Sequence, residues 1–241
     1  MVSAPKDRLI FALDVPTSAE AEILVAELKD EVGLFKVGLE LITAVGVPRM
    51  AAIMDDFGAL WFLDIKLKDI PATVGAAVKA AAAQGVKMIN IHADNSLAAI
   101  QAAAQNKGKA LLAGVSVLTS IDQIEGELLL GRSVQAQVLH CARNLVLGGA
   151  DAIICSAQEL EMLGSYSELR ELLKITPAIR LPGQPPNDQK RTMTPAEAIQ
   201  KGADYLVVGR AIKKPLEGKT RVEMARLIAD DIALGLRKRN A

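Results

Sequence analysis

The sequence contains few aromatic residues and has no excess of charge of either sign. Phe, Trp and Tyr make up 3% of its 241 residues, so the core has to be built from aliphatic side chains, which a hydrophobic content of 51% can supply. Lys and Arg together number 28, as do Asp and Glu, and no basic patch stands out. This balance argues against nucleic acid as a partner.

Cysteine and long apolar runs are scarce as well. Two cysteines, Cys141 and Cys155, do not make a disulfide framework or a zinc site, and we expect both to be buried and reduced. Uncharged apolar stretches reach about eight residues, whereas a helix needs about 20 to span a membrane. The apolar run near the N-terminus is short and stops at Asp14, unlike a signal peptide. We therefore expect a soluble cytoplasmic protein that does not bind membranes.

Short apolar runs rich in β-branched residues recur along the chain and are typical of strands. Eight such runs begin at Leu9, Leu34, Leu60, Lys87, Leu111, Asp151, Lys174 and Asp204. Most of them are apolar on both faces, which indicates parallel strands that are covered on both sides.

Amphipathic helical patterns separate these runs. Thr17 and Glu20 have the spacing of a capping box, and a stripe at i, i+3, i+4 and i+7 follows at Ala21, Leu24, Val25 and Leu28. A second stripe runs from Val74 to Ala81, and a closing helix is expected from Thr220 to Arg237. Eight β-then-α units predict a (β/α)8 TIM barrel, one α/β domain spanning residues 1–241. The alternative is an open doubly wound sheet, but the Gly-rich turn of that fold is missing after the first strand.

Charged side chains gather where the predicted strands end, and the active sites of such barrels lie at these ends. The segment "FLDIKLKDIP" places Asp64, Lys66 and Asp69 at the end of a hydrophobic strand. Side chains alternate along a strand, so Asp64 and Lys66 point to the same side, where Lys36 of the neighbouring strand can also reach. A buried structural ion pair is the alternative, but two lysines with two aspartates exceed what neutralisation needs.

The other side of the same rim has the residues of a phosphate site. Arg180 ends the seventh run, and Gly209 with Arg210 ends the eighth. These are the strand ends that often bind phosphate in barrels, and arginine binds phosphate through bidentate hydrogen bonds. The loop at about 181–193 carries Gln189 and is long for its position, so we predict a lid that grips the phosphate. A tolerated surface insertion is the alternative for this loop.

Several segments, in order over nearly the whole chain, resemble the orotidine 5′-phosphate decarboxylase family. They are "ALDV", "FKVGLEL", "FLDIKLKDIP", "VLTS", "DQKRTMTPAEAI" and "YLVVGRAI". The resemblance implies a (β/α)8 homodimer that converts orotidine 5′-monophosphate (OMP) to UMP without a cofactor or a metal. It implies that Lys36, Asp64 and Lys66 form a catalytic charge array, which Asp69 completes from the partner subunit.

The resemblance also implies how the substrate is held. The residues concerned are Asp14 for the ribose, Thr119 against the pyrimidine, Arg180, Gln189, Gly209 and Arg210 for the phosphate, and Thr73 as a further contact. Three positions depart from the family pattern: Lys68 stands where His is usual, Asp94-Asn95-Ser96 replaces a Gly-rich turn, and Ala178 replaces a Gly. We expect Lys68 to be a bystander of the charge array. His92 lies on the rim either beside the site or as a hydrogen-bonded core residue, and His140 is expected to be structural.

Two rival functions remain open on the sequence. The first is a sugar-phosphate lyase such as a 3-keto-gulonate 6-phosphate decarboxylase, which uses Mg²⁺ and needs a metal-binding carboxylate where Lys36 stands. The second is a non-catalytic barrel that binds a phosphorylated ligand, and it would be expected to have lost part of the charge array.

Overall fold

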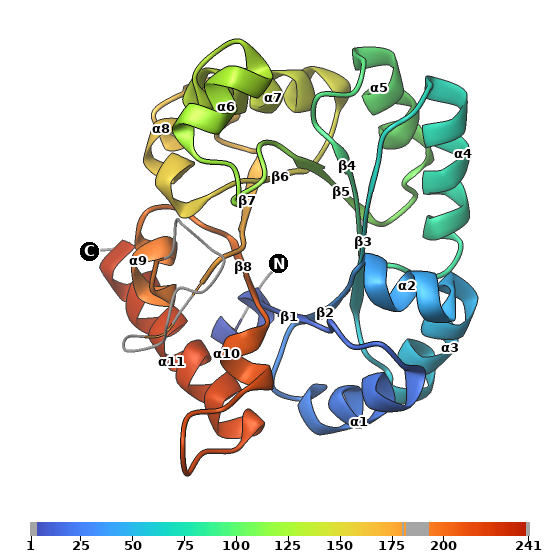
Figure 1. The fold of residues 1–241 in the computed structure, drawn as a ribbon, viewed down its shortest axis with the longest axis vertical. Coiled ribbons are helices and arrows are strands. Elements are labelled where there is room, and N and C mark those ends of the chain that lie inside the picture. The colour runs from blue at the N-terminus through green and yellow to red at the C-terminus, as the bar shows by residue number, and fades with distance from the viewer. Residues whose placement is uncertain (1–3, 180, 182–192, 240–241) are drawn as a thin grey trace.

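The computed structural model describes residues 4–179, 181 and 193–239, and its eight parallel strands close into one barrel (Figure 1). The strands are β1 (Leu9–Ala12), β2 (Leu34–Val37), β3 (Trp61–Leu67), β4 (Met88–His92), β5 (Leu111–Val115), β6 (Ala152–Ile154), β7 (Leu173–Thr176) and β8 (Tyr205–Val208). Each strand pairs with the next one along the chain, and β8 returns to β1 at Leu9–Leu206. The predicted (β/α)8 barrel is confirmed, and an open sheet is excluded.

Helices surround the barrel in the order of the chain (Figure 1). The α-helices are α1 (Ser18–Leu28), α2 (Leu39–Val45), α3 (Val47–Phe57), α4 (Pro71–Ala82), α5 (Leu97–Asn106), α6 (Gln123–Leu130), α7 (Val134–Gly148), α8 (Leu160–Gly164), α9 (Pro195–Gln200), α10 (Arg210–Lys213) and α11 (Arg221–Arg239). Three short 3₁₀ segments are η1 (Pro5–Arg8), η2 (Ala157–Glu159) and η3 (Ser167–Leu169). Within the described ranges, no helix is both long and apolar enough to cross a membrane.

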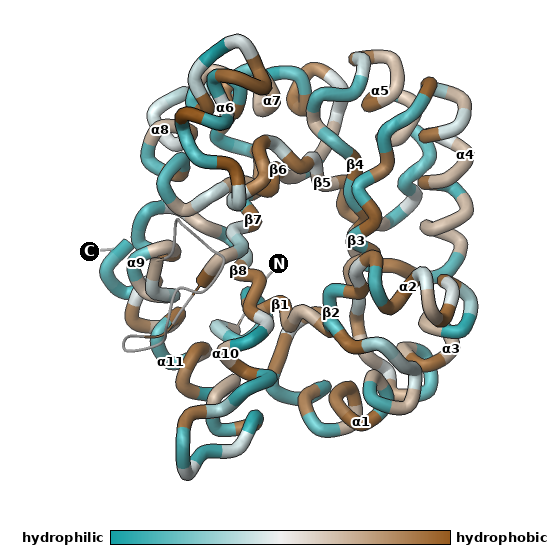
Figure 2. Tube along the Cα trace, viewed as in Figure 1, coloured by the Kyte–Doolittle hydropathy of each residue, from teal (hydrophilic) through white to brown (hydrophobic). Residues whose placement is uncertain are grey.

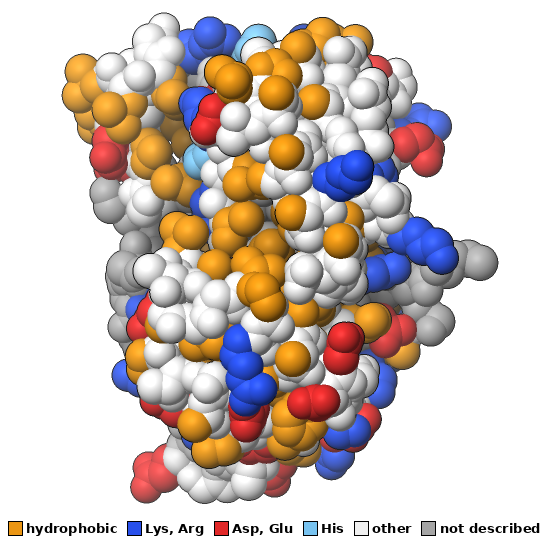
Figure 3. Space-filling model, turned by 90° about the vertical axis from the view of Figure 1, so that its right-hand side faces the viewer, with side chains coloured by type: hydrophobic (Ala, Val, Ile, Leu, Met, Phe, Trp, Pro, Cys, Tyr) orange, Lys and Arg blue, Asp and Glu red, His pale blue; other side chains and the backbone are white. Residues whose placement is uncertain are grey.

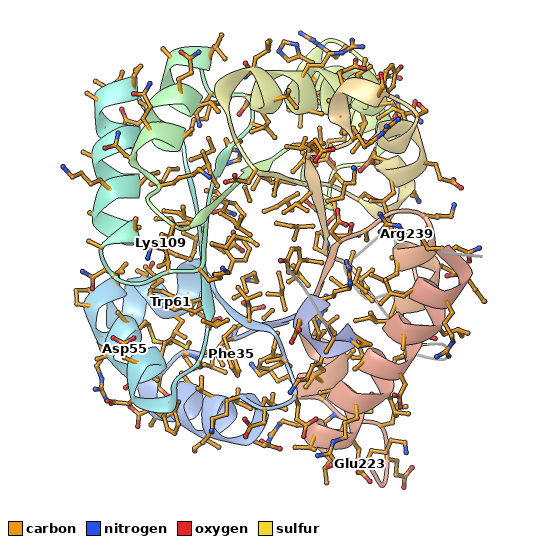
Figure 4. All side chains as sticks on the ribbon, turned by 180° about the vertical axis from the view of Figure 1, so that it is seen from behind. Phe35, Asp55, Trp61, Lys109, Glu223 and Arg239 are labelled. Carbon is orange, nitrogen blue, oxygen red and sulfur yellow. The ribbon has the colours of Figure 1, made fainter. Side chains whose placement is uncertain are left out.

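The core has two layers, one on each side of the strands. The inner layer fills the barrel with one buried residue from each strand: Ile10, Leu34, Phe62, Met88, Ala113, Ala152, Ile175 and Tyr205. The larger outer layer lies between the strands and the helices, and the strands are accordingly hydrophobic over most of their length (Figure 2). Seen from behind, side chains occupy the barrel interior, so the barrel is a packed core (Figure 4).

The predicted helical stripe of α1 is confirmed residue by residue. Its buried positions are Ala21, Leu24, Val25 and Leu28, and the Thr17 side chain accepts a hydrogen bond from the Glu20 backbone N–H. Cys141 and Cys155 are both buried free thiols, as expected. Most of the loop predicted as a lid lies outside the described residues, as do Arg180 and Gln189.

Candidate active site

Three inward-facing side chains on β2, β3 and β4 begin the site. Each follows a residue of the inner core by two positions, which puts it on the same face of its strand: Lys36 after Leu34, Asp64 after Phe62, and Asn90 after Met88. The alternation of side chains along each strand therefore sets the direction of these three polar side chains. On these three strands the inward face changes from apolar to polar within a single two-residue step.

The predicted charge array is assembled around the Asp64 carboxylate. Lys66 Nζ lies 2.6 Å from Asp64 Oδ1, and Lys36 Nζ lies 3.2 Å from Asp64 Oδ2. Lys36 Nζ is also 3.2 Å from Asp14 Oδ1, which links the end of β1 to the array. The structure thus brings together Lys36, Asp64 and Lys66 and joins Asp14 to them.

A bulge in β3 presents Lys66 to this cluster. β3 pairs with β4 at Leu63–Ile89 and then at Leu67–Ile91, so residues 64–66 lie opposite Asn90 alone. Lys66 has a φ of 52°, in the left-handed region that favours glycine. Such a conformation costs a non-glycine residue roughly 1–3 kcal/mol and persists only where its surroundings hold it. Bulges of this kind re-aim a side chain next to an active site.

The buried Asp64 and the half-buried Lys36 are both held in their ionised forms. Burial by itself would raise the pKa of Asp64, but the ammonium groups of Lys36 and Lys66 and hydrogen bonds from Lys66 and Asn90 hold that pKa below its ordinary value of 3.8. Burial likewise opposes the charge of Lys36, but Asp64 and Asp14 keep its pKa above the ordinary 10.5. A carboxylate and an ammonium are therefore both present at neutral pH.

The array forms one wall of a cavity of about 190 Å³ at the mouth of the barrel. The opposite wall is mainly apolar and consists of Val115, Val117, Leu118, Ile154, Pro177 and Val207, with Thr119 beside them. Thr119 thus lies at the cavity, and its place against the pyrimidine stays a prediction. Apolar walls exclude water, and electrostatic interactions are stronger where water is excluded.

Asp69 and Thr73 do not join the array within this chain. Asp69 is exposed beyond the end of β3, where its carboxylate accepts a hydrogen bond of 2.6 Å from the Ile70 backbone N–H. It lines a separate cleft together with Lys68, Asp94 and neighbouring residues. Thr73 is exposed in the first turn of α4, directly after this cleft.

Two of the three departures from the family pattern contact each other in this cleft. Lys68 Nζ lies 2.5 Å from Asp94 Oδ2, which joins the segment after β3 to the turn after β4. Asn95 strengthens the same connection, because its amide donates hydrogen bonds to the backbone carbonyls of Leu67 and His92. His92 Nδ1 is 3.9 Å from Asp94, while His140 is exposed on α7.

The third departure, Ala178, has a φ of 68° and is buried. The position thus has the backbone conformation that glycine adopts most readily. Gly209 and Arg210 follow β8 on the same side of the barrel. A Cβ on Gly209 would lie 3.2 Å from Ala12 Cβ and 3.8 Å from Asp14 Oδ2, so glycine keeps room beside the array.

Sequence reasoning missed Asn90 and Gly38. Asn90 stands out in "MINIHA" as an amide inside an otherwise apolar strand, and that was the available signal. Gly38 follows β2, and a Cβ there would lie 3.0 Å from Lys36 Nζ and 3.5 Å from Asp14 Oδ1. A side chain at position 38 would therefore crowd the ammonium that Asp14 and Asp64 share.

A closed (β/α)8 barrel with preorganised charges at the C-terminal ends of its strands has the architecture of the TIM-barrel enzymes. Residues 7–224 match the Orotidine 5′-phosphate decarboxylase / HUMPS family. The chain belongs to this family.

Named relatives agree with this assignment. The chain is 38% identical over 240 residues to orotidine 5′-phosphate decarboxylase of Moorella thermoacetica, covering 95% of this chain and 93% of that one. It is 42% identical over 212 residues to the enzyme of Nitrosococcus oceani, covering 86% and 90%. Among solved structures, orotidine 5′-phosphate decarboxylase from Lactobacillus acidophilus superposes with a TM-score of 0.79 at 27% identity, over 93% of this chain and 98% of that one.

Proposed function

We propose that this protein decarboxylates OMP to UMP, the last step of de novo pyrimidine biosynthesis. The observation that carries the proposal is the array of Lys36, Asp64 and Lys66 at the mouth of the barrel. Membership of the family and the names of the relatives support the same substrate. The direct test adds OMP to the purified protein and follows the loss of its absorbance as UMP forms.

The array suits this reaction because the bond that breaks leaves negative charge on C6 of the pyrimidine. The ammonium of Lys66 stabilises that charge as it develops and then donates a proton to C6. Asp64 lies beside the substrate carboxylate, and the repulsion between the two falls as CO2 leaves. Preorganised charge that stabilises the transition state is the main contribution. Lys36, itself paired with Asp14, already holds the Asp64 carboxylate, and Lys66 is already in contact with it. No cofactor or metal enters these steps.

Asp69 acts in the site of a partner subunit in this proposal. It lines a cleft separate from its own array, next to the start of α4 and the turn before α5. On the face of α4 and α5, hydrophobic side chains outnumber charged ones (Figure 3). Ile70 is 64% exposed there and Leu97 is 39% exposed, which a second copy of the chain would cover. A two-fold axis at this face would build two equivalent sites, each with Asp69 and Thr73 from the other subunit.

Mixing two inactive variants tests this arrangement. Lys66→Ala and Asp69→Ala proteins are combined until their subunits exchange, which by random pairing makes about half of the dimers mixed. In a mixed dimer, the site on the Asp69→Ala chain keeps its own Lys66 and borrows an intact Asp69. Activity should therefore rise toward about a quarter of the wild-type value. If mass spectrometry confirms exchange and activity does not recover, Asp69 acts within its own subunit or the dimer is wrong.

The remaining predicted residues hold the substrate. Asp14 binds the ribose, Thr119 lies against the pyrimidine, and Gly209 and Arg210 contact the phosphate. Arg180 and Gln189 of the predicted lid join the phosphate site. The proposed phosphate contacts lie far from the reacting carbon. Binding energy from such remote groups can stabilise the transition state.

Lys36 also separates this function from its rivals. An Mg²⁺-dependent sugar-phosphate lyase needs a carboxylate at that position, whereas here an ammonium lies 3.2 Å from Asp64. Loss of activity in EDTA would favour the metal-dependent rival, and UMP binding without OMP turnover would favour a binding protein. The two buried thiols fit a reducing compartment, and we place the enzyme in the cytoplasm.

A further inference from the structure

We propose that Asn90 is the positioning residue of the charge array. Its amide fixes the Asp64 carboxylate and the backbone of Lys66 relative to each other. The effect on turnover rests on the proposed function, whereas the effects on the Lys66 amide and on the Asp64 carboxyl do not.

Both polar atoms of the Asn90 side chain form hydrogen bonds with residues of the array. Asn90 has no exposed surface, its Nδ2 donates a hydrogen bond of 2.6 Å to Asp64 Oδ1, and its Oδ1 accepts one of 2.8 Å from the Lys66 backbone N–H. The two bonds span the bulge, since residues 64–66 have Asn90 alone opposite them on β4. One amide thus takes the place of the backbone pairing that the bulge interrupts.

The left-handed backbone of Lys66 explains why such a support is needed. A strained conformation persists when its surroundings hold it, and the bond to Asn90 Oδ1 holds the N–H of the strained residue itself. Without this acceptor, the N–H would be buried without a partner or the segment would relax toward a regular strand. Lys66 Nζ lies 2.6 Å from Asp64 Oδ1, and a relaxed segment would move the two atoms apart.

The second bond orients the carboxylate. Three side chains face Asp64: Lys36 from β2, Lys66 from β3 and Asn90 from β4. Asp14 forms an ion pair with Lys36. Asp64 Oδ1 accepts hydrogen bonds from Lys66 and Asn90, and Oδ2 forms an ion pair with Lys36. Removing the neutral donor leaves the ion pairs in place but frees the carboxylate to rotate. Removal of the Asn90 donor is therefore expected to disturb the arrangement of the charges and to leave their number unchanged.

Two substitutions separate the two bonds. Asn90→Ala removes both, whereas Asn90→Asp keeps an acceptor for the Lys66 N–H and replaces the donor to Asp64 with a second carboxylate. Asn144→Ala is the matched control, because the Asn144 amide also makes two hydrogen bonds, at 3.0 Å to the carbonyls of Ala93 and Asn95, away from the array. This control shows how the loss of an amide that makes two hydrogen bonds affects the stability of the fold.

Three measurements give the expected result. Asn90→Ala should lower kcat about 10- to 100-fold, the range for outer hydrogen-bond partners in metal sites, with KM within about threefold of wild type. Exchange of the Lys66 amide, followed by NMR without substrate, should be faster in Asn90→Ala and stay slow in Asn90→Asp. In Asn90→Asp the two like charges should move the titration of the Asp64 carboxyl, followed by NMR without substrate, upward by about one pH unit or more, and the acid limb of kcat with it. Asn144→Ala should change stability but none of these quantities.

The inference is overturned if Asn90→Ala keeps kcat within about threefold of wild type, or if its Lys66 amide stays as protected as in wild type. If Asn90→Ala does not fold, Asn90→Asp decides alone, and an unchanged Asp64 titration in that variant also overturns the inference. Failure of wild-type protein to turn over OMP would refute the proposed function but leave the amide exchange and carboxyl titration as valid tests.

Discussion

The inner face of β2, β3 and β4 differs from that of β5, β6 and β8, although all of them line one barrel. On the first three strands the inward residues change from apolar to polar over two positions: Leu34 to Lys36, Phe62 to Asp64, and Met88 to Asn90. On the other three they stay apolar: Ala113 to Val115, Ala152 to Ile154, and Tyr205 to Val207. The same strand geometry therefore gives two unlike walls to one cavity.

The charges of the cavity and its apolar surroundings thus come from different strands. The charged wall is internally compensated, with a carboxylate between two ammonium groups. The apolar wall offers water few partners and so keeps the local dielectric low, which strengthens every Coulomb interaction across the cavity. If the proposed function holds, we expect catalysis to require both walls and a change in each wall to have a different effect.

Lys66→Ala should give the largest effect and should damage the charged wall alone. Loss of both the electrostatic stabilisation and the proton donor is expected to lower kcat by at least about 10³-fold. UMP binding should survive, because the proposed phosphate site lies elsewhere. Single-turnover assays and calorimetric titration with UMP measure the two quantities, and a variant that keeps about a tenth of wild-type kcat would refute the role of Lys66.

Asp64→Asn should show how far the charged wall depends on its central carboxylate. Removing one partner of a buried ion pair costs roughly 3–5 kcal/mol, since Lys36 and Lys66 are left without it. The folded-state pKa of Asp64 lies below its ordinary value of 3.8, so its stabilisation is complete above that pH and is lost as pH falls through the lowered pKa. The difference in urea midpoint between wild type and Asp64→Asn should therefore shrink toward acid pH. A difference that stays constant over the acid range would contradict the ion pair.

Arg210→Ala tests whether the β8 side of the barrel supplies binding. A charge-assisted contact to phosphate is worth roughly 2–5 kcal/mol when one partner is removed, about thirty-fold to several thousand-fold in kcat/KM for OMP. A nucleoside substrate without phosphate should be affected much less, and it serves as the control. Equal losses for both substrates would make Arg210 a residue of the fold.

Lys68→Met should give the smallest effect, because its ion pair with Asp94 lies on the surface beside the charged wall. Exposed pairs contribute about 0.2–1 kcal/mol, so urea unfolding should change by no more than that. Burial is the main cause of the lowered pKa of His92, and Lys68 lowers it further while Asp94 raises it. Lys68→Met should therefore raise the pKa of His92 in an NMR titration, whereas Asp94→Asn should lower it. Shifts in the opposite directions would show that the cleft is arranged differently.

The sequence predicted the parts of the molecule that repeat or that lie close along the chain. Hydrophobic periodicity gave the eight strands and the buried face of α1, because the periods of strands and helices are local properties. The charge array was also foreseeable, since Asp64 and Lys66 share one strand and Lys36 ends the neighbouring one.

The supports of the array were not foreseeable in the same way. The bulge opposite Asn90 depends on the register between β3 and β4, which no local pattern fixes. The bonds of Asn90 to Lys66 and Asp64 join residues 24 and 26 positions apart, and Lys68 and Asp94 are also 26 apart. Sequence reasoning marked Lys68, Asp94 and Ala178 as departures, but the contact of the first two and the left-handed backbone of the third needed coordinates.

The pairing of β1 with β8 has a consequence for how the chain folds. Leu9 pairs with Leu206, and Arg8 donates a hydrogen bond of 3.0 Å to the backbone carbonyl of Asp204, 196 positions away. Synthesis proceeds from the N-terminus, so the ring stays open until β8 has been made. Until then β1 and the most recent strand keep unpaired edges, which can join other chains. We therefore expect closure of the ring to be a late, long-range step, during which a nascent chain exposes two strand edges.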